Sequence, residues 1–163
     1  MQGVIHQISV SRGGVPKLPV LEATVGELGL EGDGHNEPLT VHGGPERAVC
    51  LFAVERIEAL AAEGHSISPG SVGENITTRG IDWDEVTPGT EIELGEQVRL
   101  EVTRYTTPCS TIRKSFSDGN SNRIHQNLHP GWSRVYTKVL TGGVIRPGDR
   151  VRILSAVSVP PRV

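Results

Sequence analysis

Alternation of apolar and polar residues predicts several short strands along this chain. The clearest run is Val98, Leu100 and Val102, which alternate with polar residues and predict a strand over 97–104. A second alternating run covers 91–94, and the intervening Gly95 suits a hairpin turn, so these two strands should pair antiparallel. Further strands are expected over 3–10, 18–25, 76–78 and 133–140, and after the Pro-Gly turn within 146–154.

A repeat of apolar residues at three- and four-residue spacing predicts one long helix. Pro45 suits the start of this helix and Gly64 its end. Two short helices are expected over 110–116 and 121–128. The elements together predict a mainly β fold, with an antiparallel barrel-like sheet, one long helix and two short helices. The repeat consists of Ala48, Leu51, Phe52, Ile57, Leu60 and Ala61.

Composition narrows the class of protein. The 163 residues carry a net charge of −3 with acids and bases interspersed, which predicts no nucleic-acid partner and no anionic membrane partner. Two cysteines are too few for a secreted disulfide framework, although one Cys50–Cys109 bridge remains possible. No signal peptide or membrane-length apolar window is visible, so we expect a cytoplasmic protein. One domain over 1–154 and a loosely held tail over 155–163 are predicted.

Cys109 is the strongest candidate for chemistry. Pro108 cannot donate a ladder hydrogen bond, so the preceding strand should stop there and leave the thiol just beyond its end. A helix start after Cys109 would stabilise a thiolate through its backbone N–H groups. The alternative is a small buried apolar residue, the commoner fate of a free cysteine. Cys50 falls inside the predicted long helix, where packing is the favoured role.

Two further stretches combine polar side chains with glycine. His42 precedes a Gly-Gly turn and Arg47 lies one turn into the predicted helix, which together outline an anion site. Separately, His42 is explained as a turn residue and Arg47 as part of a solvated helix face. Glu74 and Asn75 stand side by side before a predicted strand, and the default explanation of Asn75 is a hydrogen bond within a local turn.

Six motifs occur in the order found in one family. Taken together they resemble the MOSC domain, the C-terminal domain of molybdenum cofactor sulfurases. The resemblance extends over about residues 1–154. The motifs are GLEGD at 29–33, HGGPERAV at 42–49, GSVGEN at 70–75, PC at 108–109, GWSRVY at 131–136 and IRPGDRV at 145–151.

The resemblance implies a barrel-like fold and a functional cysteine at Cys109. Members of the family are thought to carry sulfur as a cysteine persulfide, or to hold molybdenum cofactor with this cysteine as the metal ligand. Pyridoxal phosphate would be involved only through a partner, because no lysine here stands in a recognisable pyridoxal-binding context. The expected partners are a cysteine desulfurase or an electron-transfer reductase, with a small-molecule substrate. The expected cofactor-binding residues are His42, Arg47, Glu74, Asn75, Arg134 and Tyr136.

Several functions remain open at this point. The chain could be a molybdenum-cofactor enzyme that reduces N-hydroxylated compounds, a sulfur transferase, or a non-catalytic module that binds a cofactor or partner. A cysteine hydrolase that uses Cys109 with His42 lacks an assignable third residue. A zinc site from Cys109, His35 and His42 matches no common spacing.

Overall fold

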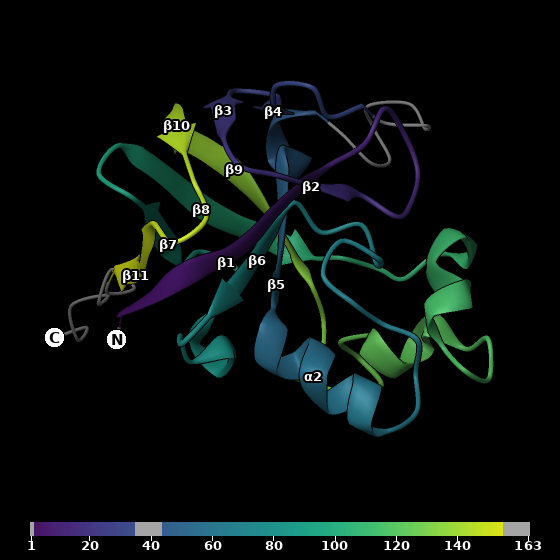
Figure 1. Ribbon diagram of the computed structural model, residues 1–163. Helices are drawn as coiled ribbons and strands as arrows, with labels where there is room; N and C mark the ends of the chain where they lie inside the picture. The colour runs from purple at the N-terminus through teal and green to yellow at the C-terminus, as the bar shows by residue number, and fades with distance from the viewer. Residues whose placement is uncertain (1, 35–43, 155–163) are drawn as a thin grey trace, which may run out of the picture.

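Seven strands close into a barrel in this computed structural model, which describes residues 2–34 and 44–154 (Figure 1). His35, His42 and the predicted tail lie outside the described residues. Around the barrel the order is β1, β11, β7, β8, β9, β5, β6 and back to β1, so the predicted mainly β, barrel-like fold is confirmed. The bounds are β1 Gln2–Val10, β5 Val49–Ala53, β6 Ile76–Arg79, β7 Glu91–Leu94, β8 Val98–Tyr105, β9 Val135–Thr141 and β11 Arg150–Leu154.

The first and last of these strands seal the barrel. β1 pairs antiparallel with β11, and Gly3 lies opposite Val151. A Cβ atom at Gly3 would run into the carbonyl oxygen of Arg79, so only glycine allows this close approach of β1 to β6. The predicted hairpin is confirmed, because β7 and β8 pair antiparallel with Leu94 opposite Val98.

The predicted long helix is wrong in its first half. Residues 49–53 form β5, which is buried at every position, and helix α2 spans only Val54–Ala62. Because β5 is apolar on both faces, its sequence lacks the alternation that marks a half-buried strand. β5 also pairs parallel with β6, with α2 between them in the chain, so the sheet is mixed rather than wholly antiparallel. Pro45–Arg47 forms only the 3-10 turn η1.

Smaller elements surround the barrel. The predicted strand over 18–25 is divided into β2 (Leu18–Val20), which extends the sheet beside β1, and β3 (Ala23–Gly26). The two predicted short helices are 3-10 helices, and Figure 1 shows them with α2 on the side of the barrel away from β7 and β11. The remaining elements are β4 Gly29–Leu30 and β10 Gly143–Ile145, which form a three-stranded sheet with β3, and the 3-10 helices η2 Trp83–Glu85, η3 Ser110–Ser115 and η4 Ser121–Ile124.

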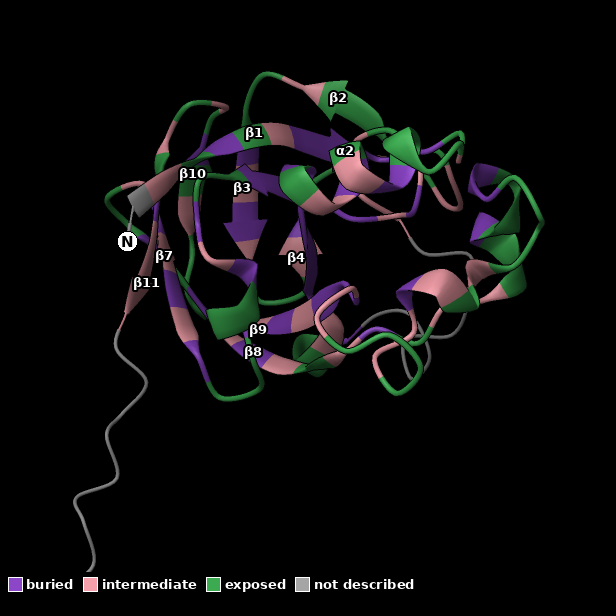
Figure 2. Ribbon diagram, turned by 90° about the horizontal axis from the view of Figure 1, so that it is seen from below, coloured by how far each residue is buried: buried purple, intermediate pink, exposed green. Residues whose placement is uncertain are grey.

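Apolar side chains from all seven strands fill the barrel, and Figure 2 shows buried segments along its wall. Phe52 of β5 packs edge-to-face against Trp83, with ring centroids 6.0 Å apart. Each fully buried side chain of this size contributes about 1.5–3 kcal/mol to stability. Over the described ranges, no helix is both long and apolar enough to cross a membrane.

Four strand ends lie level with Leu51, the middle residue of β5. Ile76 at the start of β6 lies opposite both Ile8 near the end of β1 and Leu51 in β5. Val135 at the start of β9 lies opposite both Leu51 and Tyr105, the last residue of β8. The residues next to these four ends therefore lie close together around Leu51, at a place called the rim below, although they are far apart in the sequence.

Candidate functional site

A pocket with a cavity of about 100 Å³ opens at this rim and includes Cys109 in its wall. Five of the residues predicted for the site line it together. Glu74 is buried and is not part of the lining, and His42 falls in the undescribed stretch 35–43. The five residues are Arg47, Asn75, Cys109, Arg134 and Tyr136.

Cys109 lies at the junction between β8 and η3. Its side chain is partly exposed and its Sγ is 2.7 Å from the Oγ1 of Thr111. The strand ends at Tyr105, before Pro108, as expected from the missing donor. The expected stabilisation by a helix N-terminus is not supported, because η3 is a six-residue 3-10 helix. Cys109 therefore presents a partly exposed thiol beside the hydroxyl group of Thr111.

Arg134 brings a buried guanidinium to the pocket. Only 5% of the residue is exposed, and its Nη1 donates to the carbonyl oxygen of Val72 at 2.6 Å. Its Nε and Nη2 are also buried, and neither has a hydrogen-bond partner among the described residues. Because an unsatisfied buried donor costs about 1–3 kcal/mol, these two N–H groups indicate an anion-binding position.

Glu74 supports the site from behind the wall. Its Oε2 accepts a hydrogen bond of 3.0 Å from the Thr77 hydroxyl. Burial raises the pKa of Glu74 to about 7, while backbone N–H groups of Gly70 and Glu74, the Thr77 hydroxyl and the charge of Arg134 act in the opposite direction. The carboxyl group therefore changes protonation state near neutral pH without being part of the pocket lining.

Asn75 lines the pocket, but its amide group is engaged within the protein. Nδ2 donates to Oδ2 of Asp33 at 2.9 Å and to the carbonyl oxygen of Ser9 at 3.3 Å, and Oδ1 accepts from the backbone N–H of Cys50 at 3.0 Å. These bonds join segments far apart in the chain, so the local turn expected for Asn75 is not what forms. Its amide instead links β1, β5 and the segment after β4.

Two pocket residues were missed by sequence reasoning. Lys17 is 9% exposed and pairs with Asp33 at 2.7 Å, and Cys50 is 5% exposed with its Sγ 3.8 Å from the Thr106 hydroxyl. Burial raises the pKa of the Cys50 thiol, so it stays protonated. Both Cys50 and Cys109 are free thiols rather than a disulfide. Lys17 carries no motif, and the assignment of Cys50 to a helix concealed its place in the wall.

The pocket wall is completed by Tyr136 of β9 and Arg47 of η1. Burial raises the pKa of Tyr136 to about 12, so its phenol remains a hydrogen-bond donor at neutral pH. Arg47 lies in the 3-10 turn, and α2 starts only at Val54. The long helix expected from Pro45 does not form there, and His42 lies outside the described residues. The His42–Arg47 anion site therefore stays a prediction, although the Arg47 side chain reaches the pocket.

The charge of the lining favours anionic ligands. Three cationic side chains, Lys17, Arg47 and Arg134, contribute to it, and no carboxylate does within the described part of the chain. Over the same residues, no group of three or more histidine, cysteine, aspartate or glutamate side chains could hold a metal ion.

Comparisons with known proteins identify curated relatives that are longer than this chain. YflK of Bacillus subtilis, described as uncharacterized, is 32% identical over 130 residues, covering 77% of this chain and 56% of YflK. YiiM of Escherichia coli is 32% identical over 143 residues, covering 84% of this chain and 61% of YiiM. A Gibberella moniliformis protein named Reductase is 30% identical over 131 residues, covering 77% of this chain and 22% of that protein. The chain thus spans less than two thirds of each relative.

Solved structures and a family model agree on the fold. A crystal structure of a hypothetical protein superposes with a TM-score of 0.76 at 26% identity, covering 98% of this chain and 71% of the other. Escherichia coli YiiM superposes with a TM-score of 0.72 at 24% identity, covering 97% and 72%. The family model of the MOSC domain matches residues 38–152. These residues include β5 to β9 and most of the pocket wall, and the chain therefore belongs to the MOSC domain family.

Proposed function

We propose that this chain binds molybdenum cofactor in the rim pocket, with Cys109 as the protein's ligand to the metal. The observation that carries the proposal is the buried guanidinium of Arg134, which has two N–H groups without partners among the described residues, in the same wall as a reachable thiol. Molybdenum accepts soft sulfur ligands, and the pterin carries a phosphate that a guanidinium can bind through two parallel hydrogen bonds. Association of the MOSC family with this cofactor supports the same assignment.

The residues of the pocket fit such a group. Arg134 and Arg47 supply positive charge for the phosphate, and the Tyr136 phenol supplies a donor that remains protonated. Asn75 orients the wall by its bonds to Asp33 and Cys50 rather than by reading the pterin. When bound, the cofactor would supply two-electron redox chemistry, for which reduction of an N-hydroxylated compound is our proposed example. The fungal relative named Reductase is consistent with that class.

Sulfur transfer is the second candidate, and the exposure of Cys109 favours it. A thiol that is only partly buried, 2.7 Å from the Thr111 hydroxyl, can be reached by a donor protein. Cations in the same wall would favour the anionic persulfide. Here a cysteine desulfurase partner would contain the pyridoxal phosphate. A non-catalytic module that binds a cofactor or partner is the third candidate.

Metal analysis distinguishes these functions. The chain, its Cys109→Ser variant and a Ser110→Ala control, at an exposed position outside the pocket lining, would be produced in a host that makes molybdenum cofactor, and molybdenum per chain would be measured. We expect metal in the unmodified chain and the control, and loss of at least nine tenths of it in Cys109→Ser. Such a loss corresponds to a tenfold weaker affinity for the cofactor, on the order of 1.4 kcal/mol. Metal-free protein that gains one sulfur atom on Cys109 after incubation with a desulfurase supports the carrier instead. Equal cofactor content in all three proteins would overturn Cys109 as ligand.

A further inference from the structure

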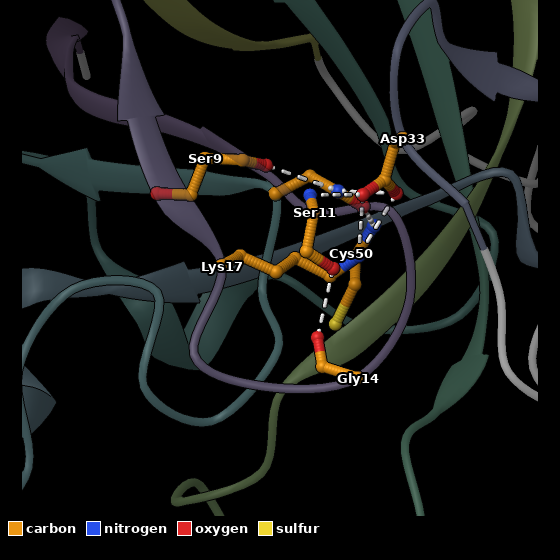
Figure 3. Close-up of polar contacts among 7 residues, drawn as sticks. Ser9, Ser11, Gly14, Lys17, Asp33 and Cys50 are labelled. Atoms are coloured by element: carbon orange, nitrogen blue, oxygen red, sulfur yellow. Dashed lines mark hydrogen bonds and ion pairs between the residues drawn. The ribbon is translucent and has the colours of Figure 1, made fainter.

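The segment 11–17 forms one wall of the pocket, and the carboxylate of Asp33 contacts both of its ends. Gly14, Val15 and Lys17 of this segment line the cavity. Oδ1 of Asp33 accepts from the backbone N–H of Ser11 at 3.0 Å and from Nζ of Lys17 at 2.7 Å. Both ends of the segment therefore contact the same side chain, as Figure 3 shows.

The same carboxylate also contacts Asn75, in the segment just before β6. Its Oδ2 accepts from Nδ2 of Asn75 at 2.9 Å and from Nζ of Lys17 at 2.9 Å. Gly34, the next residue, lines the pocket and donates its backbone N–H to the carbonyl oxygen of Ser11 at 2.7 Å. Asp33 thus has four hydrogen bonds from three residues, and all three belong to the walls or edges of the pocket.

The pairing changes the charge that the pocket presents. The side chains of Lys17 and Asp33 are 9% and 3% exposed, so solvent screens them little and the positive charge of Lys17 is largely cancelled. Asp33 does not line the cavity, whereas Lys17 does. A ligand in the cavity therefore meets an ammonium group whose charge is balanced from behind, beside the guanidinium groups of Arg134 and Arg47.

We propose that Asp33 is a specificity-determining residue, which lowers the preference of this pocket for anionic ligands by cancelling the charge of Lys17. The cavity then attracts anions mainly through Arg134, and Lys17 serves to hold the wall. Removing Asp33 would convert Lys17 into a further anion-binding cation. The inference rests on the proposed function only in taking Cys109 as the reacting group, and no metal is needed to test it.

The test compares two reagents that alkylate Cys109 in the folded protein. Iodoacetate is anionic and iodoacetamide is neutral, so the ratio of their rates measures the local potential, while the neutral rate reports access. Rates would be read on the Cys109 peptide by mass spectrometry for Asp33→Asn, Lys17→Met and the double variant. Glu31→Gln is the matched control, because Glu31 is an exposed carboxylate in the same loop.

The two single variants should shift the ratio in opposite directions. We expect a rise of about threefold for Asp33→Asn, a fall of about threefold for Lys17→Met, and a double variant within twofold of the unmodified chain. Glu31→Gln should leave the ratio unchanged. A purely structural role for Asp33 predicts shifts of the same sign or changes in the neutral rate alone, and either result overturns the proposal. If Asp33→Asn alone does not fold, the double variant still tests the proposal, because a ratio well below that of the unmodified chain would mean that Asp33 does not cancel the charge of Lys17.

Discussion

Nη1 of Arg134 donates to the carbonyl oxygen of Val72 across 2.6 Å, which joins the residue before β9 to the segment before β6. This bond fixes one corner of the guanidinium inside the rim. The neighbouring Ser133 is held as well, since its carbonyl oxygen accepts from Nε1 of Trp83 at 3.1 Å. The Nε and Nη2 donors of Arg134 are therefore held in place before any ligand arrives, which lowers the entropy cost of binding a ligand.

Arg134→Lys should weaken anion binding although it keeps the charge. Lysine has a single nitrogen, which cannot both bond Val72 and offer a fork of donors to a ligand. We expect the affinity for inorganic phosphate, measured by its effect on thermal unfolding, to fall by about tenfold. Arg113→Lys, at an exposed position on η3, is the control and should behave like the unmodified chain. Equal phosphate affinity in both variants would contradict the assignment of Arg134.

The two cysteines should differ sharply in reactivity. Iodoacetamide should modify Cys109 in the folded protein and Cys50 only after unfolding, because burial both shields Cys50 and raises the pKa of its thiol. Cys109→Ser should change the free energy of unfolding by less than about 0.5 kcal/mol, since the side chain is partly exposed. Peptide mapping before and after denaturation checks the first expectation. Rapid modification of Cys50 in the native state would show that the pocket is more open than described.

Glu74 should make stability depend on pH. The folded state raises the pKa of this carboxyl from 4.5 to about 7, so the folded protein holds a proton that the unfolded chain releases. Its contribution is complete below pH 4.5 and is lost as pH rises through about 7, by on the order of 3 kcal/mol. Glu74→Gln should match the unmodified chain near pH 4 and be more stable near pH 8. Urea unfolding at both pH values tests this, and an unchanged pH dependence would refute it.

Gly70→Ala should damage the pocket wall. Gly70 has φ +86° and a Cβ there would strike the carbonyl oxygen of Lys17, whose own N–H donates to the carbonyl oxygen of Gly70 at 2.9 Å. Gly89 has a similar φ of +93° with open space around it, so Gly89→Ala carries only the backbone strain of about 1–2 kcal/mol. We expect Gly70→Ala to cost at least about 2 kcal/mol more than this control in urea unfolding. Equal losses would mean that the wall can move.

Strands with one buried face could be predicted well from the sequence. β7 and β8 alternate cleanly, and Gly95 between them takes φ +62°, so their pairing follows from local information. Residues 49–53 could not be assigned in this way. They are buried on both faces of β5, and an apolar run of this kind also fits a helical repeat when α2 follows it directly.

The site was predictable only where a residue carried a motif. Cys109 and Arg134 stand in stretches that resemble the family, and the structure brings both into one wall. Lys17 and Asp33 are 16 positions apart in polar loops, and their contact depends on how the end of β1 turns back over the rim. No periodicity or spacing marks such a pair. The buried state of Glu74 was hidden for the same reason, because it arises from packing between distant segments.

The pairing of β1 with β11 has a consequence for how the protein is made. Gln2 faces Arg152, 150 positions later in the chain, so β1 leaves the ribosome well before its partner β11. Until β11 emerges, residues 2–4 of β1 have an open edge that could recruit a strand from another chain. Contacts this remote in the sequence also make folding slow. High-level expression should therefore produce aggregates of nascent chains more readily than aggregates of the finished barrel.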